Sequence, residues 1–170
     1  MAIELNDVRA LAEPLRQYNF EFYIPRVPGN GGDPEELRLI VTNATLPGFQ
    51  SNLFDTNYGG WTIHHAGRRE FTSPVSIDFV ETAQLHAVKA LKAWHELQWH
   101  PQTGVQVDEG EYKTEAHLRL LRHDKTLLAT AKLMGVMIES VSDVTFDTAG
   151  DDVVTVSASF SYDWWELELA

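Results

Sequence analysis

Histidine is the residue type that could most readily do chemistry in this chain, which has seven histidines and no cysteine. Imidazole side chains bind metals and transfer protons near neutral pH. The run His95-Glu96-Leu97-Gln98-Trp99-His100 has the look of a zinc-protease helix. That motif places its histidines four residues apart, whereas a five-residue step turns about 140° around a helix. His64 and His65 are adjacent and would point to opposite sides of a strand. The histidines therefore predict no metal site, and solvated or hydrogen-bonded imidazoles are the favoured interpretation.

Motifs for other catalytic or cofactor chemistry are also incomplete. The absence of cysteine excludes a disulfide scaffold, a CxxC motif and a thiol nucleophile. Gly29, Gly31 and Gly32 do not complete GxGxxG, because position 34 is proline. The sequence has no Walker A motif and no GxSxG motif. The acidic residues are scattered, and no motif pairs two of them for general acid and base work. We therefore expect neither an enzyme nor a cofactor.

The charge balance argues against a protein that grips nucleic acid. Acidic residues outnumber Lys and Arg by 25 to 13, which gives a formal net charge of -12. Binding to DNA depends on Lys and Arg against phosphate, so this surface repels DNA on average. The 170 residues, 44% of them hydrophobic, predict one globular domain over 1–170.

The hydropathy of the chain predicts no membrane anchor. No apolar run approaches the roughly 18–20 residues of a membrane helix. The start of the chain has no apolar segment of the kind that secretory signals carry. We therefore expect synthesis and assembly in a cytoplasm.

The elements of the first half follow from turn signals and periodicity. A short helix is expected over Val8–Ala12, with Asn6 or Asp7 as its cap. Apolar and polar residues then alternate from 17 to 24, which predicts a half-buried strand. A glycine-proline turn follows at 25–34, and 37–42 is predicted to return as a second strand, so that 17–44 forms a hairpin.

The middle of the chain changes character twice. The segment 48–71 is long, polar and rich in glycine, and a loop of this length is usually functional or intersubunit. A strand is expected over 72–80, followed by a helix over 81–99 that contains no Gly or Pro. The apolar residues of that helix recur every third position, which predicts a broad buried face. These residues are Leu85, Val88, Leu91, Trp94 and Leu97.

The second half is predicted to consist of strands over 115–168. The expected strands are 116–121, 127–133, 136–146 and 153–167. In the last, Val154, Val156, Ala158, Phe160, Tyr162 and Trp164 alternate with polar residues that include Ser157, Ser159 and Ser161. The predicted fold class is mainly β, of the α+β kind, with antiparallel strands and one central helix.

An ordered set of structural residues resembles the tail-tube proteins of contractile-tailed bacteriophages of the T4 type. The resemblance covers almost the whole chain. It is carried by Tyr18-Asn19-Phe20-Glu21-Phe22, Ala44-Thr45-Leu46-Pro47-Gly48-Phe49, Gly67-Arg68-Arg69-Glu70-Phe71-Thr72, a helix with Trp94, Glu111-Tyr112-Lys113 and Phe160-Ser161-Tyr162-Asp163-Trp164-Trp165. The glycine-proline insert at Pro25–Pro34 departs from the pattern.

The resemblance implies a fold, an assembly and a set of partners. The fold is two packed antiparallel sheets that form a partly closed barrel, with one flanking helix and a long loop. Six subunits form a ring, and the rings stack into a hollow tube inside a sheath. Its partners are further copies of itself, the tail sheath protein, and the baseplate or tube-initiator and tail-terminator proteins at the ends. DNA passes through without specific binding, and the protein is part of the virion, assembled in the cytoplasm of the bacterial host.

Two surfaces are expected to serve this role. The loop 48–71 is the predicted ring-to-ring contact, with Phe49, Asn52, Phe54, Tyr58 and Trp61 as stacking candidates. A channel for DNA should carry more acid than base, because Lys and Arg would hold the polymer. The residues expected to line it are Asp78, Glu115, Glu139 and Asp143.

Two other functions fit the same pattern. One is the inner tube of a phage-like contractile injection or secretion system, which shares the implied fold. The other is a monomeric β-barrel that holds a small ligand in its interior.

Overall fold

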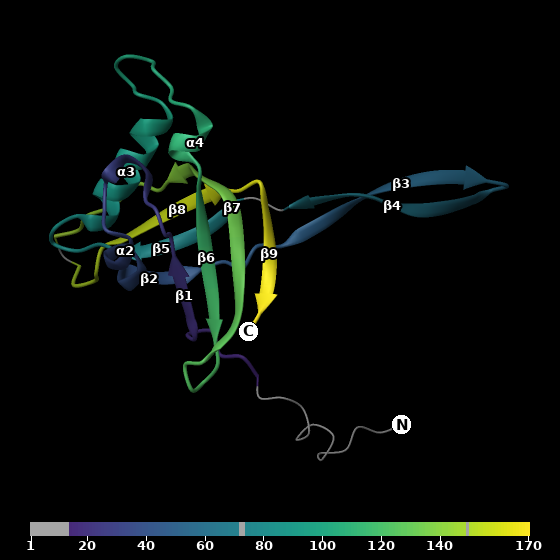
Figure 1. The fold of residues 1–170 in the computed structure, drawn as a ribbon, viewed down its shortest axis with the longest axis horizontal. Helices are drawn as coiled ribbons and strands as arrows, with labels where there is room; N and C mark the ends of the chain where they lie inside the picture. Colours follow the sequence, from purple (N-terminus) through teal and green to yellow (C-terminus); the bar gives the residue numbers. More distant parts are fainter. Residues whose placement is uncertain (1–13, 72–73, 149) are drawn as a thin grey trace.

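The structure is a computed structural model that describes residues 14–71, 74–148 and 150–170 (Figure 1). The helix expected at 8–12 lies outside these ranges. The strands are β1 Phe20–Tyr23, β2 Val41–Ala44, β3 Phe49–Tyr58, β4 Trp61–Phe71, β5 Val75–Val80, β6 Thr114–Leu121, β7 Leu127–Val141, β8 Thr155–Ser161 and β9 Trp164–Leu169. The helices are η1 Pro28–Asn30, α2 Pro34–Ile40, α3 His86–Gln98 and α4 Glu109–Tyr112.

Seven strands form one antiparallel sheet in the order β1-β6-β7-β8-β5-β2, and β9 also pairs with β7. The N-terminal half of β7 pairs with β6 and β9, and its C-terminal half pairs with β8. The long strand therefore belongs to two layers. Figure 1 shows β1, β6, β7 and β9 lying along a common axis, each antiparallel to its neighbour, with β2, β5 and β8 crossing them.

The turn between the layers occurs at Gly135 and Asp163. Gly135 has a φ of 68°, which is a left-handed conformation within β7. The partner strand is interrupted at the same level, because β8 ends at Ser161 and β9 begins at Trp164. The predicted continuous strand over 153–167 is therefore two strands. The alternation shifts by one residue at the break, so that Trp165, and not Trp164, packs against the core.

The core lies between the two layers, and α3 fills their open side. Trp94 of α3 is 1% exposed, and its ring lies 5.5 Å from that of Phe160. Its indole nitrogen donates a hydrogen bond of 2.7 Å to the carbonyl of Tyr112. The predicted helix over 81–99 is thus confirmed with shorter bounds. Its buried face includes Leu91 and Ala90 besides Trp94.

The predicted strand over 37–42 is wrong for its first part. Residues 34–40 form α2, whose first turn has Pro34 at its start and a side-chain oxygen of Asp33 accepting from the backbone nitrogen of Glu35 at 2.9 Å. The expected hairpin over 17–44 is also wrong, because β1 pairs with β6 and β2 pairs with β5. These strands are sequence neighbours that lie at opposite edges of the sheet.

The predicted long loop over 48–71 is a two-stranded hairpin. Strands β3 and β4 pair from Phe49↔Phe71 to Tyr58↔Trp61, and Gly59-Gly60 connects them. Both glycines have positive φ, as a two-residue hairpin turn requires. Figure 1 shows this arm extending far from the body of the molecule.

The fold class is confirmed as mainly β, with antiparallel strands and a flanking helix, although the layers do not close into a barrel. The predicted strands 127–133 and 136–146 are one strand, β7. Across the ranges that the structure describes, no helix is long and apolar enough to span a membrane.

Candidate functional site

The arm has one aromatic face. Residues at the same level on β3 and β4 point to the same side, which places Tyr58 beside Trp61 and Phe54 beside His65. Tyr58 is 81% exposed and Trp61 is 78% exposed. The rings of Phe54 and His65 stack at 5.0 Å. Ile63 lies between these pairs, opposite Thr56, whose hydroxyl lies 2.8 Å from Nε2 of His65. The face that runs to the tip is therefore mainly apolar, with this one polar pair within it.

The opposite face of the arm is polar toward the tip, whereas Leu53 and Ala66 lie on it nearer the root. Nδ1 of His64 lies 2.6 Å from Oδ1 of Asp55. One step nearer the tip, the hydroxyl of Thr62 donates to the side-chain carbonyl of Asn57 at 2.8 Å. These paired polar groups are suited to water. The arm is therefore amphipathic, and its aromatic face is the one that needs a partner.

Aromatic contacts hold the root of the arm on the body. The guanidinium of Arg69 lies 4.6 Å from the centroid of the Phe49 ring. The Phe49 ring lies 6.4 Å from that of Trp165. The indole nitrogen of Trp165 donates to the carbonyl of Gly48 at 3.3 Å. The body thus fixes the direction in which the arm leaves it.

The stacking candidates therefore divide by position. Phe54, Tyr58 and Trp61 share the aromatic face. Phe49 lies at the root and contacts the body. Asn52 sits at the bulge of β3, where its amide donates to the carboxylate of Glu70.

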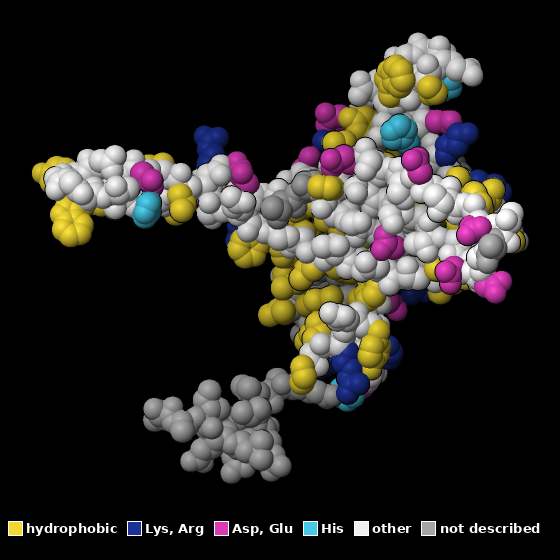
Figure 2. Space-filling view, turned by 180° about the vertical axis from the view of Figure 1, so that it is seen from behind, with side chains coloured by type: hydrophobic (Ala, Val, Ile, Leu, Met, Phe, Trp, Pro, Cys, Tyr) yellow, Lys and Arg dark blue, Asp and Glu magenta, His cyan; other side chains and the backbone are white. Residues whose placement is uncertain are grey.

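A second surface is the outer face of the layer formed by β2, β5, β8 and the C-terminal half of β7. None of these strand segments contains Lys or Arg. Ser157 and Ser159 face away from the core, as the sequence predicted. In the view from behind, the broad side of the body is mainly uncharged polar surface with scattered acidic side chains (Figure 2).

Two of the four channel candidates belong to this polar face. Asp78 accepts a hydrogen bond of 3.0 Å from the side-chain nitrogen of Asn43. Glu139 accepts a hydrogen bond of 2.5 Å from the hydroxyl of Ser161. Asp143 follows Ser142, whose backbone nitrogen donates to the carbonyl of Ser157, the register partner of Asp78. Glu115 lies on β6 in the other layer. The structure therefore places Asp78 and Glu139 on this face with Asp143 at its edge, and it separates Glu115 from them.

The outer face around Glu115 has mixed charge. Nζ of Lys132 lies 2.6 Å from Oε1 of Glu168, and Arg119 lies 3.9 Å from Glu21. His117 is partly buried between them. Its burial lowers the pKa of the imidazole from its ordinary value of 6.5, and the nearby Glu115 carboxylate opposes that effect. This arrangement offers no nucleophile with an adjacent base.

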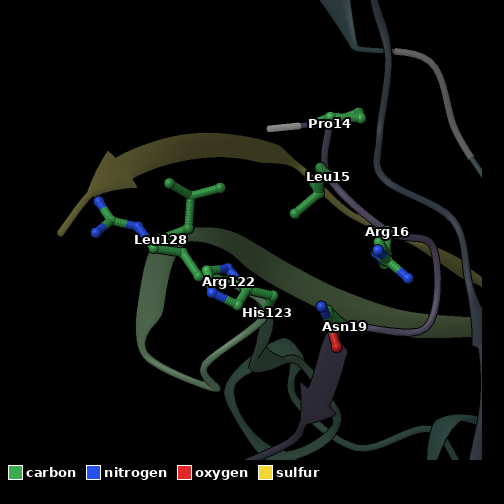
Figure 3. Close-up of a pocket in the computed structure, with 7 residues that line it drawn as sticks. All are labelled: Pro14, Leu15, Arg16, Asn19, Arg122, His123 and Leu128. Atoms are coloured by element: carbon green, nitrogen blue, oxygen red, sulfur yellow. The ribbon is translucent and has the colours of Figure 1, made fainter. Parts of the chain in front are cut away.

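No group of three or more His, Cys, Asp or Glu side chains among the described residues could hold a metal ion. The hollows around the body are open to solvent, and Figure 3 shows the one at the N-terminal end of β7. The conspicuous features among the described residues are surfaces. Sequence reasoning located the arm, but it missed the strand pairing that gives the arm one aromatic face.

No family model and no curated protein matches the chain. Solved structures do. A chain of the cryo-EM structure of the sheath–tube complex of PVC, an extracellular contractile injection system in its extended state, superposes with a TM-score of 0.68. The match covers 99% of this chain and 100% of that one at 12% identity.

Two further structures give the same result. A chain of the sheath/tube terminator structure of PVC has a TM-score of 0.69, with 14% identity over 94% of this chain and 99% of that one. A chain of the tube-terminating cap of the anti-feeding prophage has a TM-score of 0.67, with 15% identity over 95% of each chain. This chain has their fold. The similarity covers 94–99% of this chain, and at these identities it concerns the fold alone.

Proposed function

We propose that this chain is a structural subunit of the tube of a phage-like contractile particle. Rings of six subunits stack into a hollow tube inside a contractile sheath. The observation that carries the proposal is the arm, whose aromatic face is uncovered in the single subunit. Support comes from the full-length likeness to chains in the PVC sheath–tube and terminator structures.

The energetics of the arm favour a contact with another copy. A Tyr or Trp side chain buries about 150–250 Å² in an interface, which corresponds to roughly 4–6 kcal/mol of gross burial energy. Tyr58 and Trp61 together can therefore offset a large part of the cost of association. The contact of Phe49 with Trp165 at the root sets the direction in which the arm leaves the body. Ring-to-ring stacking by the arm is the assignment that we propose.

The polar face that contains Asp78 and Glu139 is the proposed channel wall. Duplex DNA carries one charge per about 1.7 Å of its axis, and each Lys or Arg contact adds affinity. A wall without Lys or Arg avoids such contacts, and sixfold repetition turns each carboxylate into a ring of negative charge. The polymer then stays mobile. The mixed-charge face around Glu115 would lie elsewhere in the ring, against neighbours or the sheath.

Within this proposal, the tail tube of a contractile phage is the first candidate. DNA would pass through the channel into the host, and the subunit would be part of the virion. An injection-system tube is the second, and the origin of the similar structures in PVC and the anti-feeding prophage favours it. The two candidates require the same rings and stacking and differ in what the channel carries.

Shortening the arm tests the proposal. Deleting residues 55–58 together with 61–64 leaves Phe54 and His65 joined by Gly59-Gly60, which preserves the register of the remaining hairpin. We expect soluble subunits or rings and no long tubes by negative-stain imaging. A matched control replaces Asp55, His64, Asn57 and Thr62 with serine, which changes only the polar face. Normal tubes from the shortened protein would contradict the assignment of the arm.

A further inference from the structure

A hollow with apolar walls lies at the N-terminal end of β7 (Figure 3). It has a volume of about 350 Å³, and Pro14, Leu15 and Leu128 form its apolar part. Leu15 is 51% exposed, although it faces this hollow. The volume falls within the range of roughly 300–1,000 Å³ that suits a small organic group. One aromatic side chain is a group of that class.

The rim of the hollow is basic in a chain whose overall charge is acidic. Arg16, Arg122 and His123 line it. Nζ of Lys125, in the same turn, donates at 2.8 Å to the side-chain oxygen of the buried Asn19 at the edge of the hollow. Asp124, the one acid of the turn, is engaged by Thr126 at 3.0 and 2.7 Å. Arg122 thus lies at the rim beside a carboxylate that Thr126 already engages.

A matching projection lies at the other end of β7. Phe146 is 77% exposed in the segment 142–148, with Asp143 and Asp147 three residues before it and one after it. Beyond Lys132 the chain contains no Lys or Arg at all. That stretch, 133–170, holds eight acids: Glu139, Asp143, Asp147, Asp151, Asp152, Asp163, Glu166 and Glu168. The exposed ring of Phe146 is therefore flanked by acids in the sequence, and the nearest basic groups lie on α3, where Lys92 and His95 line a hollow with Val144.

The projection cannot reach the hollow of its own subunit. Leu128 and Val141 are thirteen residues apart on one strand, a separation of up to roughly 43 Å at about 3.3 Å per residue. Figure 1 shows the β6–β7 turn and the segment after β7 at different ends of the sheet. A surface that fits a different part of an identical molecule makes a head-to-tail contact, which produces rings or stacks.

We propose that Phe146 of one copy inserts into the hollow between Leu15 and Leu128 of a neighbouring copy. Asp143 then faces Arg122 of the rim. This contact deepens the proposed self-assembly and rests on it. It is separate from the arm, and it joins the opposite ends of β7 in two neighbouring copies. The aromatic ring supplies burial, and the charge pair fixes the partner and its orientation.

The absence of cysteine makes a clean cross-linking test possible. Phe146→Cys and Leu15→Cys are introduced together into the full chain, and each single variant serves as a control. A disulfide needs Cβ atoms about 3.5–4.5 Å apart, so it reports close contact. After mild oxidation, a single variant can give at most a dimer on a non-reducing gel. We expect the double variant to give a ladder of trimers and higher products.

The outcomes separate this proposal from the proposed function. If the wild-type protein forms rings but the double variant gives no product beyond a dimer, the proposed insertion of Phe146 into the hollow is wrong. The proposed function would still stand. Wild-type protein that stays monomeric in analytical ultracentrifugation would overturn both.

Charge reversal provides the second measurement. We expect Arg122→Glu to raise the concentration needed for assembly by at least tenfold, and Asp143→Lys in the same chain to restore much of the loss. Arg26→Glu is the control, because Arg26 pairs with Glu111 away from the hollow. If Asp143→Lys worsens the defect of Arg122→Glu, the proposed pairing is wrong.

Discussion

The side chain of Asp163 lies directly over the backbone of Gly135, where β7 passes from one layer to the other. A methyl group at Gly135 would overlap the Asp163 carboxylate. That carboxylate also accepts from Nζ of Lys113 at 3.2 Å, and Lys113 lies 3.1 Å from Glu109. This small cluster holds the bend of β7 against the break between β8 and β9. The relative orientation of the polar face and the arm therefore depends on a glycine.

Gly135→Ala should destabilise the subunit for two reasons. Gly135 has a φ of 68°, which costs an alanine about 1 kcal/mol, and the new methyl group must also displace Asp163. We expect a total loss of about 2–4 kcal/mol in urea unfolding. Gly104→Ala is the matched control, because Gly104 has a φ of 65° with no heavy atom near its Cβ position. Equal losses in the two variants would show that Asp163 imposes no constraint.

His117 should make the fold sensitive to mild acid. Burial lowers the pKa of His117 in the folded state below its ordinary value of 6.5, so the unfolded chain binds a proton at higher pH than the folded chain. The unfolding free energy should therefore fall as pH drops from 7.5 to 5.5. We expect His117→Gln to reduce this fall, as measured by the urea midpoint at both pH values. The exposed His100→Gln is the control, and equal sensitivity in wild type and His117→Gln would contradict the prediction.

The tip of the arm should matter for assembly and not for folding. Trp61 is 78% exposed in the subunit, so Trp61→Ser should change the unfolding free energy by no more than about 0.5 kcal/mol. We expect the same variant to abolish long tubes in negative-stain images. Asn57→Ala, on the polar face of the same hairpin, should leave tube length unchanged. A large loss of subunit stability in Trp61→Ser would mean that the indole packs within its own subunit.

The channel assignment is tested by two variants with equal charge change. Glu139 lies on the polar face, whereas Glu115 lies on the other layer. We expect tubes of Glu139→Lys to retain short duplex DNA in a sedimentation assay, with retention that weakens as salt increases. Tubes of Glu115→Lys should retain little. Stronger retention by Glu115→Lys would place the other layer on the channel.

Local signals in the sequence predicted much of the fold. Alternating apolar residues in β5 and β8 predicted a strand-rich domain. A stretch around Trp94 that contains no Gly or Pro predicted its one main helix. The buried residues Ile77, Phe79 and Phe160 all follow from period two. These elements are predictable because one face of each is buried, and burial imposes the pattern.

The arm and α2 escaped prediction for different reasons. Both faces of β3 and β4 are exposed, so no core imposes alternation on them. Gly59-Gly60 was the available signal for a hairpin. In α2, Leu37 and Leu39 suggested a strand, but Asp33 and Pro34 form a helix start that outweighs two alternating residues. The layer that each acid occupies depends on strand pairing between distant segments, which local patterns do not encode.

Self-assembly of the purified full-length chain is the most direct test of the central claim. Sedimentation velocity, with negative-stain imaging of the same sample, distinguishes a subunit of 19.2 kDa from a hexamer of about 115 kDa and from longer stacks. We expect sixfold rings at low concentration and tubes at higher concentration, without added cofactor. A single species of 19.2 kDa that persists at the highest soluble concentration would contradict the proposal that this chain builds a tube.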